Sequence, residues 1–397
     1  MKLNEDEIRY MKTKEELFSI ISSFKKKEEP LNFEIIKNGV ILPVKPEHGY
    51  KWGLGGVVSS DDVFIKNSLH PGYFKESENR FGGYYTYNKA DYIDETVIYC
   101  DPIILQWGHF LVDSISRLWY AMNSNYRIAF CGYGFPEGGL SGSYLRFMEL
   151  IGIEKARLLD VRKPTKFKNI IIPEMSYIAD LYYTKEYLNI FDTAIKNINA
   201  DAGKAFDNVE KVYFTRCQFK DNGARTREYG EKQLESIFRY NGFTIISPEK
   251  CSLDQQIYLM SHCKSFVSLS GTVAHNILFS RDIDSFIILN KTSHSQRQQY
   301  YLNEISGVKI VNIDVYKEPL IKLNIPKDTG YGPFLIGCTS YFIKYANETG
   351  LYLIHSNLYY QFIWGIKFLW LLMILPIRKI RFAFLKFKRG YLKLIRK

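Results

Sequence analysis

The stretch Ser265-Phe266-Val267-Ser268-Leu269-Ser270-Gly271-Thr272-Val273-Ala274-His275-Asn276 predicts a buried strand, a glycine turn and a short helix, in that order. The sequence on either side repeats the alternation. We predict strands over residues 211–216, 243–246, 265–269 and 285–289, and helices over 231–241, 252–264 and 273–280. Strands that alternate with helices in this way are typical of a doubly wound parallel sheet, so the predicted fold class is α/β.

The chain of 397 residues is longer than one ordinary domain. A charged helix is predicted over residues 1–30, and short strands with Gly- and Pro-rich connections follow to residue 100. Further strands at 127–132 and 169–173 flank a helix at 143–152, and residues 185–208 are helical. We predict an N-terminal α/β domain over residues 1–200, a Rossmann-like domain over 201–330 and a C-terminal extension over 331–397.

Residues 108–122 predict a mostly buried helix with one narrow polar stripe. At roughly 100° per residue the stripe spans about 60° and holds His109, Asp113, Ser116 and Tyr120. A buried histidine and aspartate one turn apart must face a cleft or satisfy each other, because burying either without a partner is costly. The second alternative is a structural pair in which Asp113 also reaches Arg117.

The turn at residues 270–276 presents backbone N–H groups at the start of a helix, where the helix dipole favours an anion. Ligands of parallel sheets bind beyond the carboxyl ends of the strands, where this turn and Arg216 lie. We predict a nucleotide-diphosphate site formed by Arg216, Arg225, Arg227, Gly271, Thr272, His275 and Asn276. The alternative is a turn that only caps its helix. Nothing in the sequence assigns a function to His48, His70, His262, His294 or His355.

The net charge of +11 is concentrated at the end of the chain. Residues 376–397 hold nine lysines and arginines, and no acidic residue follows Glu348. The uninterrupted apolar run at 368–375 is shorter than the ~20 residues of a membrane span. We expect residues 359–397 to lie as an interfacial helix on an anionic membrane surface, with no role for nucleic acid. The alternatives are a helix packed across the two domains, a nucleic-acid tail or a marginal membrane span.

The six cysteines show no zinc-ligand spacing, and free thiols in a reducing cytosol are the simplest interpretation. The N-terminal residues Met1-Lys2-Leu3-Asn4-Glu5-Asp6-Glu7 lack the apolar segment of a signal peptide. We therefore expect a cytoplasmic protein that is peripheral on the inner face of the plasma membrane.

Several ordered blocks span residues 95–315: Gly108-His109-Phe110-Leu111-Val112-Asp113 with Arg117-Leu118-Trp119, Val212-Tyr213-Phe214-Thr215-Arg216, Gly242-Phe243 with Ser247-Pro248-Glu249, Leu253-Asp254-Gln255-Gln256, and Gly271-Thr272-Val273-Ala274-His275-Asn276. Together they resemble glycosyltransferase family 61, whose bacterial members are often associated with capsular polysaccharide. The resemblance implies a GT-B fold, in which two Rossmann-like domains face a cleft and the C-terminal one binds the nucleotide sugar. It also implies inversion at the anomeric carbon without a required metal. The family's paired arginines are separated here, in Gly223-Ala224-Arg225-Thr226-Arg227, so either can meet phosphate.

An inverting transfer needs a base for the acceptor hydroxyl and positive groups for the leaving diphosphate. We expect His109 and Asp113 to supply the base, one orienting the other, and the residues do not say which. Asp282-Ile283-Asp284 has the DxD spacing of metal-dependent transferases, but it precedes its strand, and we expect no metal.

The predicted function is that of a glycosyltransferase with no cofactor, which transfers a sugar from a nucleotide sugar, expected as a UDP-sugar, to a lipid-linked capsular or other surface polysaccharide. The alternatives are a non-catalytic nucleotide-sugar or glycan binding subunit of an assembly complex, and a hydrolase that uses His109 and Asp113.

Overall fold

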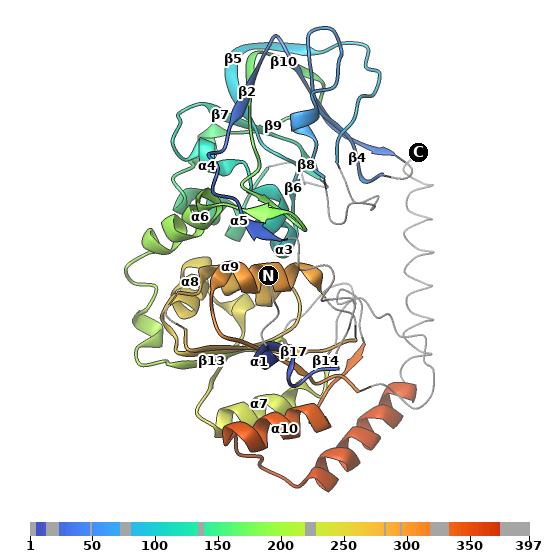
Figure 1. The fold of residues 1–397 in the computed structure, drawn as a ribbon, viewed down its shortest axis with the longest axis vertical. Coiled ribbons are helices and arrows are strands. Elements are labelled where there is room, and N and C mark those ends of the chain that lie inside the picture. The colour runs from blue at the N-terminus through green and yellow to red at the C-terminus, as the bar shows by residue number, and fades with distance from the viewer. Residues whose placement is uncertain are drawn as a thin grey trace.

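A computed structural model describes residues 5–12, 24–47, 50–71, 81–133, 139–218, 228–281, 283–293, 296–317 and 333–373. These residues form a mixed α/β fold with two main sheets, which lie one above the other in Figure 1. The α/β class predicted from the sequence is therefore confirmed.

The first sheet has seven strands in the order β4-β3-β10-β5-β7-β9, with β2 paired to β10. Its centre is parallel, and β2, β3 and β4 are antiparallel additions. Helices α5 (Gly142–Leu150) and α6 (Lys185–Lys196) accompany it. The strands are β2 (Phe33–Lys37), β3 (Val40–Glu47), β4 (Tyr50–Val58), β5 (Asp91–Tyr99), β7 (Arg127–Phe130), β9 (Leu158–Asp160) and β10 (Thr165–Pro173). The strands predicted at 127–132 and 169–173 and the helix at 143–152 are confirmed within a few residues.

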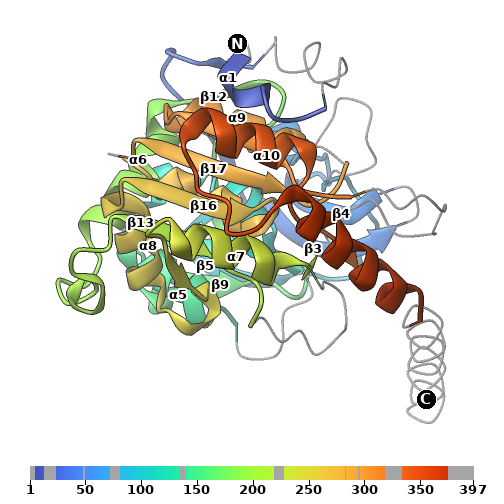
Figure 2. The same cartoon turned by 90° about the horizontal axis from the view of Figure 1, so that it is seen from below.

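The second sheet has five parallel strands in the order β15-β13-β16-β17-β18. Apolar residues of α7 and α10 pack on one face, and those of α8, α9 and the 3₁₀ helix η6 pack on the other. Figure 2 shows α7 and α10 lying across the sheet on the side nearer the viewer. The strands are β13 (Lys211–Phe214), β15 (Thr244–Ile246), β16 (Ser265–Leu269), β17 (Ser285–Asn290) and β18 (Ile310–Asp314), and the helices are α7 (Glu231–Tyr240), α8 (Leu253–His262), η6 (Thr272–Phe279), α9 (Arg297–Ser306) and α10 (Ser340–Thr349). The doubly wound pattern predicted from 211–289 is confirmed, and β18 extends it.

Local sequence signals account for several element ends in this sheet. Ser252 and Gln255 form the capping box that their spacing predicts, with each side chain bonded to the other residue's backbone N–H. Gly271 has φ 136°, so this turn suits a residue without a side chain.

The start of the chain differs from the predicted charged helix. Only Glu5–Ile8 is helical within the described residues 5–12, and Lys25–Lys26 form the short strand β1. Contacts with the second sheet account for this difference. Tyr10 forms an isolated β-bridge with Ile313, and the backbone N–H of Lys12 donates to Asp314 Oδ2 over 2.8 Å. Residues 5–12 therefore pack against the second sheet.

A continuous apolar cluster joins the two sheets. The rings of Phe191 on α6 and Phe279 on η6 lie with their centroids 5.4 Å apart. Arg146 on α5 holds both carboxylate oxygens of Asp254 on α8, at 2.8 and 2.9 Å. These contacts fix α5 and α6 against the helices of the second sheet.

After α10 the chain turns at Gly350 and forms a last described helix over residues 357–373. Figure 2 shows this dark red helix running outward from the second sheet. Within the described part of the chain, none of the helices has the length and hydrophobicity that a membrane span requires.

Candidate functional site

The predicted helix at 108–122 is broken into three pieces. The structure has α3 (Trp107–His109), a π-helical turn over Phe110–Ser114, and α4 (Leu118–Ala121). The break has a tertiary cause, because other segments bind the carbonyl groups that a regular helix would use. Tyr187 Oη donates to the carbonyl of Leu111 over 2.9 Å, and Ser176 N donates to the carbonyl of Ser116 over the same distance.

The predicted polar stripe is therefore wrong in its second half. Ser116 is fully buried, and Tyr120 lines a separate pocket on α4. His109 and Asp113 stay together, because the π-turn keeps residues four apart on nearby faces. π-Turns of this kind occur often at functional sites.

His109 and Asp113 form a direct hydrogen bond, with 2.8 Å between His109 Nδ1 and Asp113 Oδ2. Asp113 is buried, whereas the His109 side chain is 26 % exposed. An ionised carboxylate only accepts hydrogen bonds, so we assign the proton on this edge to Nδ1. This leaves Nε2 of His109 with a lone pair.

The alternative pairing of Asp113 with Arg117 is not found. The fully buried Arg117 donates instead to Asp101 Oδ2 over 2.9 Å and to the carbonyl of Asn67 over 2.8 Å. Arg117 thus ties the broken helix to β5 and to the segment after β4.

A second histidine lies at the other oxygen of Asp113. His70 Nε2 is 3.7 Å from Asp113 Oδ1, and both side chains are about 4 % exposed. No function was predicted for His70, because the sequence around it carries no pattern that indicates one. Only the packing of the loop after β4 against the π-turn brings it here.

His275 faces this group from η6 of the second sheet. Its imidazole packs directly on Gly108, where an added Cβ atom would lie 2.8 Å from Nδ1. Among the described residues, neither ring nitrogen has a hydrogen-bond partner of ordinary geometry. Burial, and then the electrostatic interaction with His109, lower the pKa of His275 to about 4. The imidazole is therefore neutral near pH 7, with one ring nitrogen as a donor and the other as an acceptor.

Asn276 and Thr272 complete the contact between the two sheets at this point. The indole N–H of Trp107 donates to Asn276 Oδ1 over 2.7 Å. Thr272 Oγ1 would lie 3.4 Å from a Cβ atom on Gly108. Asn276 is thus used in holding α3 against η6, and the structure brings the predicted base pair and the predicted turn to one place.

The carboxyl edge of the second sheet gathers the charged groups. Arg216 follows β13, and its Nε donates to Glu228 Oε1 over 3.2 Å. Lys291 follows β17, and its Nζ donates to the same oxygen over 2.8 Å. A Cβ atom on Gly271 would lie 3.8 Å from Lys291 Nζ, so this ammonium group sits beside the turn. Arg216 and the turn therefore share one edge, as predicted.

Sequence reasoning missed Lys291 and Glu228. A lysine directly after the apolar run of β17 was the available signal, because it must lie at the carboxyl edge of its strand. Burial lowers the pKa of Lys291, and Glu228 opposes that shift. Lys291 and Arg216 therefore share one carboxylate oxygen of Glu228 at this edge.

A buried acidic group lies next to Arg216 at the start of α7. Glu231 accepts hydrogen bonds from the backbone N–H of Arg216 over 2.9 Å and from Thr215 Oγ1 over 3.4 Å. Burial raises the pKa of Glu231 to about 7. The side chains of Cys217 and Glu235 are close enough to form a metal-binding group with it. Burial raises the pKa of Cys217, and its thiol donates a hydrogen bond to Glu231 Oε2 over 3.6 Å.

Three predicted residues cannot be placed. Arg225, Arg227 and Asp282 lie outside the described residues. Asp284 immediately precedes β17, at the edge of the sheet opposite Arg216 and Gly271. That position agrees with the argument against a DxD metal site.

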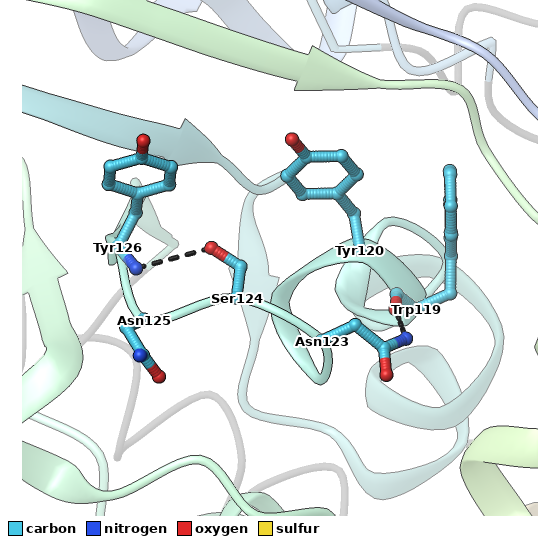
Figure 3. Close-up of a pocket in the computed structure, with 6 residues that line it drawn as sticks. All are labelled: Trp119, Tyr120, Asn123, Ser124, Asn125 and Tyr126. Carbon is cyan, nitrogen blue, oxygen red and sulfur yellow. Dashed lines mark hydrogen bonds between the residues drawn. The ribbon is translucent and has the colours of Figure 1, made fainter.

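A pocket of about 650 Å³ lies on the first sheet's side, at the end of α4. It is lined by Trp119, Tyr120, Asn123, Ser124, Asn125 and Tyr126, and Figure 3 shows the rings of Tyr120 and Tyr126 pointing the same way. Aromatic faces beside amide groups suit a ligand with apolar and hydroxyl surfaces, such as a sugar ring. None of the predicted site residues lines it.

Comparison with known proteins gives a family for this arrangement. Residues 107–287 match the family model described as Glycosyltransferase 61. No curated protein matches the chain. The matched range starts in α3 and ends in β17, so it contains His109, Asp113, Arg216, Gly271 and His275. Residues 107–287 are therefore a glycosyltransferase family 61 domain, and the protein is a glycosyltransferase.

Proposed function

We propose that this enzyme transfers a sugar, with inversion and without a metal, from a nucleotide sugar to a surface polysaccharide acceptor. The observation that carries the proposal is the meeting of the His109–Asp113 pair with His275 and the turn at Gly271. One side supplies a base, and the other supplies groups for an anion. We further propose that the two sheets act as the two domains of a GT-B enzyme, with residues 1–200 on the acceptor side and 201–330 on the donor side.

We assign the base to His109 and the orienting role to Asp113. Asp113 is buried and accepts a hydrogen bond from Nδ1 of His109. The lone pair on Nε2 of His109 can therefore take the proton of an acceptor hydroxyl. The acceptor oxygen then bonds to the anomeric carbon as the bond to the diphosphate oxygen breaks. His70 at the second oxygen of Asp113 supports the same orientation.

The leaving diphosphate belongs at the carboxyl edge of the second sheet. Arg216, Lys291 and the N–H groups after Gly271 supply positive charge and hydrogen bonds there. The neutral imidazole of His275, buried without an ordinary partner, is suited to bond a phosphate oxygen or a sugar hydroxyl. Arg225 and Arg227 stay candidates for the same anion.

The acceptor is proposed to be a lipid-linked capsular or other surface glycan. The pocket at Trp119 and Tyr126 offers rings and amides to a sugar chain on the first sheet's side. The six cysteines are all free thiols, which supports work in the cytosol, where nucleotide sugars would be the donors.

A nucleotide-sugar turnover assay tests the proposal. The purified protein is given UDP-, GDP- and CMP-sugars, with and without EDTA, first without an acceptor and then with a surface-glycan acceptor. We expect an acceptor-dependent, EDTA-insensitive release of nucleotide from one donor class, with UDP-sugars first. Release without acceptor would indicate a hydrolase. Binding without release would indicate a binding subunit.

A further inference from the structure

We infer that the outer face of the helix at residues 357–373 is a docking surface for an anionic lipid bilayer. Seven large apolar side chains of this helix are exposed: Leu358, Tyr359, Phe362, Ile366, Leu369, Trp370 and Met373. Leu358 is 82 % exposed and Phe362 is 66 % exposed. Apolar side chains exposed in one contiguous patch mark an interaction surface.

The seven side chains form a single band. At roughly 100° per residue they fall within about 120° of the helix circumference. The polar residues of the helix, Asn357, Gln361 and Lys367, all lie outside this band. A helix with one fully apolar face and no span-length hydrophobic segment suits the plane of a membrane interface.

The opposite face fixes the helix to the second sheet. Tyr360 and Leu371 are buried, and Gln361 Oε1 accepts a hydrogen bond from Lys317 Nζ over 2.9 Å. At the edge of the band, the ring of Trp370 packs against Tyr229 with 5.0 Å between centroids. Tyr229 directly follows Glu228, the carboxylate shared by Arg216 and Lys291. The band is therefore held beside the donor edge of the enzyme.

The positive charge of the sequence that follows the helix favours an anionic lipid surface over the other partners that the apolar band could contact. The sequence after the helix contains nine lysines and arginines and no acidic residue. Lysine and arginine side chains near an anionic bilayer are attracted to its surface. A second copy of this chain carries the same net charge of +11 and so offers no complementary charge. Nucleic acid would neutralise the charge but leave the apolar band exposed to water.

Vesicle flotation of the full-length protein tests the inference. The protein is mixed with phosphatidylcholine vesicles, with or without phosphatidylglycerol, at low and at high salt. The test variant combines Phe362→Gln, Ile366→Gln and Leu369→Gln. The control variant combines Ile35→Gln and Val63→Gln, which removes apolar side chains that are 51 % and 62 % exposed near the first sheet. Thermal unfolding of each variant verifies its fold.

We expect the wild type and the control to float with anionic vesicles only, and the test variant to lose at least about tenfold in affinity. Failure of the wild type to float would overturn the inference. Undiminished flotation of the test variant would also overturn it and assign binding to the basic segment alone. A third outcome is that the wild type is dimeric by light scattering, the test variant is monomeric and neither binds vesicles. That result would assign the band to contact with a second copy and overturn the inference. Flotation needs no nucleotide sugar, so its failure would leave the proposed transferase activity standing.

Discussion

Gly108 and His275 are in direct contact across the junction of the two sheets: a Cβ atom on Gly108 would lie 2.8 Å from His275 Nδ1. A methyl group does not fit between these two residues, so α3 and η6 can approach this closely only because residue 108 is glycine. His275 is buried, so a larger side chain at residue 108 must displace either this ring or α3.

Gly108→Ala is expected to push His275 and α3 apart, to cost about 1–3 kcal/mol of stability and to reduce transfer at least tenfold. The matched control is Gly365→Ala, where a Cβ atom meets nothing within 4 Å on the helix at 357–373. That control should keep or slightly raise the melting temperature, because alanine favours a helix. Equal activity of Gly108→Ala and wild type would contradict the close junction.

Replacing the proposed base pair should stop the chemistry and leave donor binding intact. His109→Ala and Asp113→Asn are each expected to lower kcat by about 10²-fold or more, since general base catalysis is worth that much. Nucleotide affinity, measured by calorimetry, should stay within about twofold of wild type. The control is His262→Ala, which removes a histidine stacked on Tyr258 in α8. Near-normal kcat in both test variants would exclude His109 and Asp113 from the reaction.

Lys291 is expected to contribute directly to donor binding. Lys291→Met should weaken nucleotide affinity at least about tenfold, because a charge-assisted bond to phosphate is lost. Lys264→Met, at the exposed residue that precedes β16 on the opposite edge of the sheet, should have no effect.

A double variant separates binding from structure at this position. Glu228→Gln combined with Lys291→Met removes the buried Lys291–Glu228 ion pair, and the glutamine amide oxygen can still accept the hydrogen bond from Arg216, so stability is expected to recover. If Lys291 binds the donor, affinity in the double variant stays low. Full recovery of affinity would show that Lys291 acts only through Glu228.

Glu231 makes the stability of the protein depend on pH. Its pKa is raised by burial from 4.5 to about 7, so between these values the folded state binds more protons than the unfolded state. The free energy of unfolding therefore falls as pH rises from about 4.5 to 7, by roughly 3 kcal/mol at most from this group. Glu231→Gln should flatten that fall in urea unfolding curves.

Glu7 provides an internal reference for the same experiment. Burial also raises the pKa of Glu7 to about 7, at a different place, where the helix Glu5–Ile8 contacts Asn303. The single variants Glu7→Gln and Glu231→Gln should each remove part of the slope, and the double variant should remove more. A slope that is unchanged in Glu231→Gln would show that this carboxyl is ionised in the folded protein.

Local patterns in the sequence determined four of the five strands of the second sheet, whereas β18, α9 and α10 were not predicted. The apolar runs at 211–216 and 265–269 became β13 and β16, and the Ser252 capping box began α8 where its spacing placed it. These elements form from signals within a few residues, and the right-handed parallel crossover then leaves little choice of topology. Because the strands are parallel, the residues that follow β13 and β16, Arg216 and Gly271, lie at one edge of the sheet.

The tertiary structure alone decided the shape of the 108–122 segment and the partners of its charged groups. Hydrogen bonds from Tyr187 and Ser176 break the helix that the apolar periodicity favours, and Asp101 takes Arg117 away from Asp113. No local sequence pattern predicts such contacts, because the partners are 16 to 76 residues away in the chain. The pairing of His70 with Asp113 arises in the same way.

The sequence by itself thus determined the α/β class and the family, because both depend on short-range order in the chain, and it predicted the two residues of the proposed base pair. Only the tertiary structure decided that His275 meets Gly108, that Lys291 shares Glu228 with Arg216, and that the helix at 357–373 leaves its apolar band exposed. These are contacts between elements, and their free energies depend on burial and distance, which no single stretch of sequence contains.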